Sequence, residues 1–371
     1  LGIYGFLKYL DNAKYLYLFV IAFAISLYTY HSARLISPLL ALSLVIIYWK
    51  QINILKNLKP FAIGVIICIP LIFQMLSKEG QSRFTGVSVF SDSGPLWQAL
   101  EARREHPAGL YVRLVHNQYL SYGLRFVKNY LSHYSPRFLF ITGDEIARSK
   151  VPGMGQTYLL LIPFYFFGLL SLLKLDSRGK KLIFIWFLIA PLAAAMTFQS
   201  PHALRSQNMV IPLSIITALG IVELFNQLPR VALAKWGSFC IFGFLSFFSV
   251  SQYLHQYYVH YPKELPYAWQ YGFDQIADTV KTNYDKYDKF IITDRYDQPY
   301  ILMAFFLQYP PQKLQSQMNM TPRDKFGFST LNSFDKFVFK KINYEVDKKY
   351  PNTLIIASMD EPVDNTKVIF T

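Results

Sequence analysis

The sequence predicts a membrane α-helical bundle of about seven transmembrane helices, followed by a C-terminal extracytoplasmic α/β domain. Of the 371 residues, 53% are hydrophobic and only 16% are charged, whereas soluble domains contain about 25% charged residues. The apolar residues lie in blocks whose lengths suit a hydrocarbon core of about 30 Å. The last part of the chain instead alternates helical and strand patterns. These observations exclude a single soluble domain.

Seven apolar blocks are predicted to be transmembrane helices. They span residues 15–28, 35–49, 61–76, 158–173, 182–198, 209–224 and 234–250. The resulting organisation has three helices in 1–76, a long extracytoplasmic loop in 77–157, four helices in 158–251 and an extracytoplasmic α/β domain in 252–371. Several blocks are near the short limit of about 17 residues for a spanning helix.

The net charge of +14 is unevenly distributed along the chain. From Gln252 onward, 14 basic residues balance 14 acidic ones, so the whole excess lies in the membrane part. A basic nucleic-acid-binding domain would concentrate this charge on a soluble surface, whereas here it accompanies the apolar blocks. The predicted partner is therefore the lipid bilayer, and no nucleic acid is expected.

Three alternate short connections between the blocks are basic. Because Lys and Arg accumulate in short cytoplasmic loops, we place these connections in the cytoplasm and the long loop and C-terminus outside. The basic residues are Lys50, Lys56 and Lys59, then Lys174, Arg178, Lys180 and Lys181, and finally Arg230 and Lys235.

Two regions outside the spans carry recognisable patterns. Residues 110–131 alternate aromatic and aliphatic with basic residues, which predicts one amphipathic helix that either lies in the membrane interface or packs on the bundle. In the tail, helices are predicted at 268–282 and 300–307. Strands are predicted at 289–293, 337–339 and 354–357.

Two histidine–arginine pairs are candidate phosphate ligands. His31 and Arg34, and likewise His202 and Arg205, are three residues apart, a spacing that puts both side chains on one helical face. Arginine binds phosphate through two charge-assisted hydrogen bonds. Both pairs are predicted at the outer membrane boundary, where the alternative is that the arginines snorkel or tie loops together.

Acidic residues are scarce before residue 252. None lies at the middle of a predicted span, which disfavours an ion-coupled pump. Asp144 and Glu145 are candidate cavity carboxylates, with a turn and helix cap as the alternative. Cys68 and Cys240 have no neighbouring ligands at metal-binding spacing, so no metal site is predicted in this chain.

Four segments together resemble a known family. In order they are LYTYHSAR at 27–34, YSPRFLFITGD at 134–144, PHALR at 201–205 and AWQYG at 268–272. Their order and predicted membrane placement resemble the C-terminal two-thirds of bacterial GT-C superfamily glycosyltransferases of the dolichyl-phosphate-mannose-protein mannosyltransferase-like type.

The resemblance implies transfer of a hexosyl or pentosyl group from a polyprenyl-phosphate donor to an acceptor lipid, glycan or protein. The reaction would occur at the outer face of the bacterial inner membrane. In this family a carboxylate in the first outer loop, or a divalent metal that it binds, serves catalysis. No residue here matches it, so the chain is expected to be an inactive fragment without a catalytic residue. A transporter or flippase of lipid-linked intermediates and a non-catalytic membrane subunit remain alternatives.

Overall fold

The chain forms two compact units in a computed structural model, Leu1–Tyr261 and Pro262–Thr371. Each unit has its own hydrophobic core. The structure describes residues 1–52, 58–77, 80, 86–106, 109–174, 176–228, 231–296, 298–323 and 329–361.

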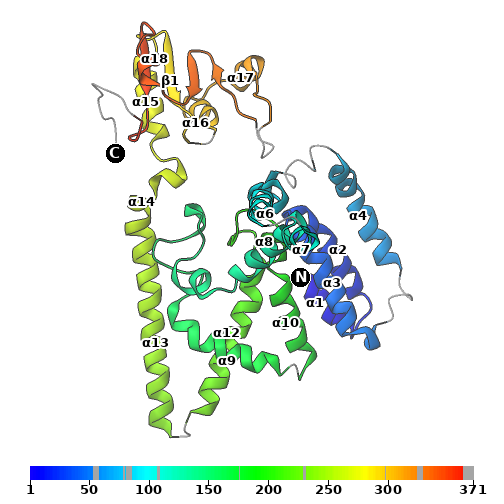
Figure 1. Cartoon of the computed structure of the whole chain (residues 1–371). Helices are drawn as coiled ribbons and strands as arrows, with labels where there is room; N and C mark the ends of the chain where they lie inside the picture. The colour runs from blue at the N-terminus through cyan, green and yellow to red at the C-terminus, as the bar shows by residue number, and fades with distance from the viewer. Residues whose placement is uncertain are drawn as a thin grey trace. The chain divides into compact units, whose positions relative to one another are not determined.

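The first unit begins with four helices (Figure 1), and aromatic side chains pack the first three of them together. Phe6 is fully buried, and its ring lies 5.1 Å from that of Phe19 and 5.6 Å from that of Tyr48. These contacts join the first three helices. The helices are α1 (Gly2–Tyr9), α2 (Tyr15–Thr29), α3 (Ala33–Ile47) and α4 (Lys59–Leu76), and a 3-10 turn, η1 (Trp49–Gln51), follows α3.

The long loop contains short helices. The prediction of one continuous helix over 110–131 is wrong, because the chain breaks at His116 and Asn117. Asn117 is extended, and its side chain accepts a hydrogen bond from the Leu120 amide at 2.9 Å, so it starts a new helix as an N-cap. The elements are η3 (Val89–Ser91), α6 (Gly94–Glu105), α7 (Leu110–Val115), α8 (Gln118–Ser132), η4 (Arg137–Ile141) and η5 (Ala147–Ser149).

Helices α9 and α12 lie side by side and approach closely at two glycines. A Cβ placed at Gly220 would lie 1.7 Å from the carbonyl oxygen of Phe164. One placed at Gly168 would lie 1.8 Å from that of Ile216. The remaining elements of this unit are η6 (Leu159–Leu161), α9 (Ile162–Leu173), α10 (Arg178–Ile189), α11 (Leu192–Ala195), η7 (Gln207–Met209), α12 (Val210–Gln227), α13 (Ala232–His255) and η8 (Gln256–His260).

Three helical segments among the described residues are long and apolar enough to cross a membrane: Lys59–Leu76, Gln207–Gln227 and Lys235–Glu264. They coincide with the third, sixth and seventh predicted spans. The third of them continues past the predicted end at residue 250, because residues 251–261 contain no proline or glycine that would end the helix.

The other four predicted spans are shorter. Tyr15–Thr29, Ala33–Ile47 and Leu159–Leu173 are apolar helices of fewer than 18 residues, and 15 residues at 1.5 Å each extend only about 22 Å. The block at 182–198 is divided at Pro191 into α10 and α11. The structure therefore does not establish a bundle of seven spanning helices.

The basic connections are partly described. Lys56 and Arg230 lie outside the described residues. At the end of α3, the Arg178 guanidinium lies over the Tyr48 ring, 5.5 Å from its centroid. This contact brings the first and second basic connections to the same end of α3, opposite Arg34.

The second unit is a small α/β fold with a mixed four-stranded sheet in the order β2-β3-β1-β4. β1 is parallel to both β3 and β4, with Phe290 opposite Phe337 and Leu354, while β2 is antiparallel to β3. β1, β3 and β4 confirm the three predicted strands within a residue, whereas β2 was not predicted. They are β1 (Lys289–Thr293), β2 (Ser333–Phe334), β3 (Phe337–Lys340) and β4 (Thr353–Ile356).

Helices flank this sheet and bury Phe273, Val280 and Met303 against it. The helix predicted at 268–282 starts later, because Gln270 and Gly272 have positive φ values of 55° and 99° that end the preceding turn. The elements are α14 (Tyr261–Glu264), η9 (Pro266–Trp269), α15 (Phe273–Asn283), α16 (Pro299–Phe306), α17 (Pro311–Gln317) and α18 (Tyr344–Asp347).

The close packing of α9 on α12 predicts the effect of adding a methyl group. Gly220→Ala should destabilise the protein by about 1–3 kcal/mol, because its Cβ must displace backbone rather than a flexible side chain. Thermal unfolding in detergent measures the effect. Gly243→Ala in α13 is the matched control, since a Cβ there meets nothing within 4 Å. Equal unfolding temperatures for the two variants would contradict the close packing.

Candidate functional site

A cavity of about 480 Å³ in the first unit collects three of the four predicted phosphate ligands. Arg34 and His31 reach it from the start of α3, and Arg205 reaches it from the loop before η7. The cavity is lined by Tyr30, His31, Ser32, Arg34, Leu35, Met75, Gly80, Val87, Ser88, Ala193, Met196, Thr197 and Arg205. Two arginines separated by 170 residues of sequence therefore line one cavity.

The turn between α2 and α3 places Arg34 in the cavity wall. Tyr30 is extended and ends α2, and the chain then turns directly into α3. The Arg34 amide donates to the His31 carbonyl at 3.2 Å, and the Leu35 amide donates to Ser32. These two amides are already hydrogen-bonded within the turn. An anion at the start of α3 would therefore have to bind to side chains. The Arg34 Nε donates to the Leu27 carbonyl at 3.4 Å.

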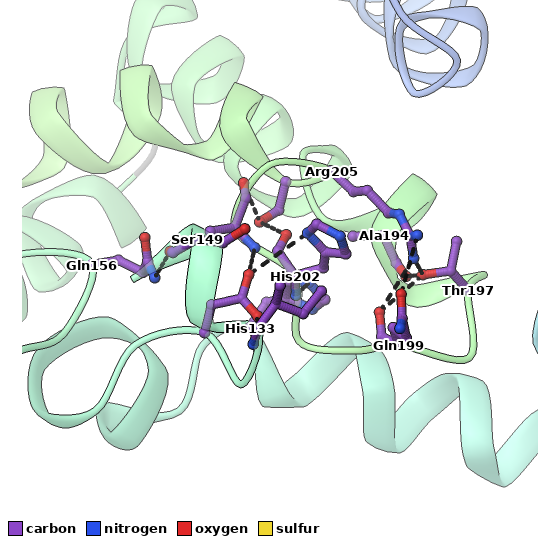
Figure 2. Close-up of polar contacts among 12 residues, drawn as sticks. His133, Ser149, Gln156, Ala194, Thr197, Gln199, His202 and Arg205 are labelled. Carbon is purple, nitrogen blue, oxygen red and sulfur yellow. Dashed lines mark hydrogen bonds and ion pairs between the residues drawn. The ribbon is translucent and has the colours of Figure 1, made fainter. Parts of the chain in front are cut away.

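Arg205 is fixed by a neighbouring loop (Figure 2). Its Nη1 donates to the Thr197 hydroxyl at 2.8 Å, and its Nη2 lies 3.5 Å from the Gln199 side-chain oxygen. The Thr197 segment is in turn paired with the start of η3, since the Val89 amide donates to Met196 at 2.8 Å. This pairing joins two loops that are distant in the sequence.

His202 is buried and does not appear in the cavity wall, although its spacing from Arg205 predicted a shared ligand. Its Nδ1 lies 3.6 Å from the Asp144 carboxylate, and its amide donates to His133 Nε2 at 3.2 Å. His133 Nδ1 pairs with the Asn129 carbonyl at 2.8 Å. His133 is thus a donor at Nδ1 and an acceptor at Nε2, which requires the neutral ring.

Both histidines are held in the neutral form. Burial, and after it the charge of Arg205, lowers the pKa of His202 from 6.5 to about 4, against an opposing contribution from Asp144. Burial also lowers the pKa of His133, against its hydrogen bond to Asn129. Neither His133 nor His202 therefore adds positive charge next to the cavity.

The two candidate carboxylates have different surroundings. Asp144 is only 1% exposed and accepts the Ala203 amide at 2.7 Å and the Ile146 amide at 2.9 Å. Glu145 is exposed. Asp144 thus fits the alternative in which the carboxylate caps a turn. Its two oxygens accept hydrogen bonds from backbone amides of two loops. Neither carboxylate lines the cavity.

Sequence reasoning missed the residues that support this arrangement. Asn129 is 3% exposed and donates from its amide to the Thr197 carbonyl at 3.0 Å. His133 and Thr197 complete the support. The spacing of Asn129 and His133 could have indicated their role. They are four residues apart and so lie on one face of a helix, opposite its leucines.

The chemistry of the wall favours an anion with an apolar part. Arg34 and Arg205 supply the charge, and the apolar side chains include Leu35, Met75 and Met196. The lining residues within the described ranges include no Asp or Glu. The described part of the chain likewise has no group of three His, Cys, Asp or Glu residues that could hold a metal ion.

Comparison with known proteins adds no relative. No family model matches the chain, and neither a curated protein nor a solved structure matches it. The resemblance to GT-C glycosyltransferases therefore stays a prediction that rests on the residues quoted for it.

The two hydrogen bonds of Asp144 predict its role in stability. Asp144→Ala should lower the free energy of unfolding by about 2–4 kcal/mol, because a charged acceptor is lost and the Ala203 amide is left unpaired. Glu145→Ala is the matched control and should change stability by less than about 0.5 kcal/mol. The comparison uses thermal or denaturant unfolding in detergent, and an equal loss in both variants would refute the anchoring role.

The lowered histidine pKa values predict acid sensitivity. Unfolded histidines take up protons at about pH 6.5, before the buried ones do. The contribution of these neutral histidines to the free energy of unfolding should be fully present above pH 6.5. It should decline as the pH falls toward about 4. His202→Gln should flatten this decline, whereas His255→Gln, at an exposed position in α13, should not. Unfolding temperatures measured from pH 7.5 to 4.5 test this, and identical slopes in all three proteins would contradict it.

Proposed function

We propose that the first unit binds the phosphate of a polyprenyl-phosphate-linked sugar and forms part of a membrane glycosyltransferase. The observation that carries the proposal is the presence of Arg34 and Arg205 in one cavity wall. The resemblance of the sequence to GT-C glycosyltransferases supports the same assignment.

The two arginines suit a phosphate because they approach it from different elements. Arg34 belongs to the first turn of α3, and Arg205 belongs to a loop held by Thr197. Each guanidinium can give a phosphate two parallel N–H···O bonds. During sugar transfer, charge accumulates on the departing lipid phosphate, and cations already in place stabilise that charge.

The apolar part of the wall suits the isoprenoid next to the phosphate. Leu35, Met75 and Met196 line it, and Met75 lies near the end of α4, one of the segments long enough to cross a membrane. A lipid chain could then run along apolar helices while its phosphate meets the arginines. A free sugar phosphate would gain nothing from these side chains.

We assign no catalytic base to a described residue. A base has to reach an acceptor hydroxyl, and both oxygens of Asp144 are occupied by backbone amides. We propose that sugar transfer uses a carboxylate, with or without a divalent metal, that is not among the described residues of this chain. The present residues would hold the donor and stabilise the leaving phosphate.

We further propose that the cavity opens at the extracytoplasmic face of the bacterial inner membrane. Tyr48 and Arg178 meet at the opposite end of α3 from Arg34, and both adjoin connections rich in Lys and Arg. By the positive-inside rule that end faces the cytoplasm.

Removing either cavity arginine should weaken lipid phosphate binding. Arg34→Gln and Arg205→Gln should each raise the Kd for polyprenyl phosphate by about 10- to 100-fold, since a charged hydrogen bond contributes about 1.5–3 kcal/mol. Native mass spectrometry in detergent measures the binding, with uncharged polyprenol as the reference ligand. Arg148→Gln, at an exposed arginine in η5, is the control and should bind as the unchanged protein does.

The outcomes separate the alternatives. Unchanged phosphate affinity in both arginine variants would refute the phosphate site. Affinity that depends on both arginines, with no sugar transfer by the complete protein, would favour a flippase of lipid-linked intermediates. A copurifying protein without lipid binding would favour a non-catalytic membrane subunit.

A further inference from the structure

Helix α8 exposes a stripe of aliphatic side chains. Leu120, Leu124, Val127 and Leu131 are 41%, 62%, 49% and 58% exposed. Their spacing of four, three and four residues places them on one face of the helix. The stripe therefore runs along nearly the whole of α8 and has no covering element among the described residues.

The opposite face of α8 carries buried polar groups toward the C-terminal end of the helix. Asn129 is 3% exposed and pairs with the Thr197 carbonyl, and His133, which caps the helix, is fully buried against the His202 amide. The Tyr130 hydroxyl donates to the Leu188 carbonyl at 2.8 Å. A helix on the surface of a soluble protein has the reverse arrangement, with its apolar face inside.

Helix α7 extends the exposed apolar surface and adds charge. Leu110, Tyr111 and Leu114 are 75%, 74% and 63% exposed. Arg113 and Lys128 are also exposed, and residues 110–132 contain no Asp or Glu. The segment is therefore apolar and cationic at once.

From this pattern we propose that the outer face of α7 and α8 lies in the interfacial layer of a lipid bilayer, with α8 in the membrane plane. The aliphatic stripe would enter the acyl region, and Arg113 and Lys128 would meet anionic headgroups. The chemistry is that of interfacial amphipathic helices, which combine an apolar face with flanking Lys and Arg. Exposed tyrosines such as Tyr111 and Tyr119 suit the same layer.

A bilayer fits this surface better than water or a protein partner does. A continuous apolar patch of this length is unfavourable in water. The same unit contains segments long enough to cross a membrane, so lipid is already expected beside it. The excess of positive charge complements an anionic leaflet.

Helix α8 also supports the wall of the cavity. The buried face of α8 holds the Thr197 segment through Asn129, and Thr197 holds Arg205. The helix that contacts lipid is thus two hydrogen bonds away from a cavity guanidinium. Lipid contact and the position of Arg205 are joined by one rigid element.

Spin labelling tests the proposal directly. The full chain with Cys68→Ser and Cys240→Ser, which removes both cysteines, receives single cysteines at Leu120, Leu124 or Leu131 and is placed in nanodiscs of phosphatidylglycerol and phosphatidylcholine. Labels on the stripe should relax more with oxygen, which partitions into lipid, than with a water-soluble nickel chelate. A label at Gln118 is the control, because it is exposed and lies about 200° around the helix from Leu120.

Each result has a defined meaning. High oxygen and low nickel accessibility along the stripe, with the reverse at Gln118, supports the bilayer contact. Nickel accessibility at every position would show a water-exposed face, and low accessibility to both reagents would show a protein partner. Either of the last two results overturns the proposal. A label on the exposed side does not require repacking of the buried face, so each variant remains informative.

Discussion

The buried Asp144 carboxylate holds together the two loops on which the candidate site depends. It accepts the Ala203 amide from one loop and the Ile146 amide from its own, and it faces His202. A buried carboxylate is costly unless its oxygens are paired. Here the backbone supplies that pairing, so the same contacts that make its burial tolerable also fix the course of the chain before Arg205.

The cavity can be understood as a consequence of this anchor. With the 197–205 loop held in place, Arg205 meets Thr197 and faces the start of α3, where Arg34 lies. His133 and His202 are neutral and add no positive charge to that of the two guanidinium groups. The result is a concentrated cationic patch beside apolar side chains, which is the combination that a lipid-linked phosphate requires.

Helix α8 connects the site with the surroundings of the protein. Its polar face supports the cavity loop through Asn129, and its aliphatic face is exposed. Exposure of this aliphatic face would be unfavourable in water. Apart from the long apolar helices, the exposed aliphatic face of α8 is the observation that most favours lipid as the solvent around the first unit.

The sequence alone determined the local features. Alternation in the tail located strands β1, β3 and β4. Long apolar runs located Lys59–Leu76, Gln207–Gln227 and the part of Lys235–Glu264 up to residue 250. Such patterns report on short-range geometry, in which each residue acts through its immediate neighbours. The break at Asn117 is local as well, because the Asn117 side chain caps the Leu120 amide three residues later. Tertiary structure decided the burial of His202 and the meeting of Arg34 with Arg205. These depend on hydrogen bonds and packing between segments far apart in the chain, whose partners no local pattern specifies.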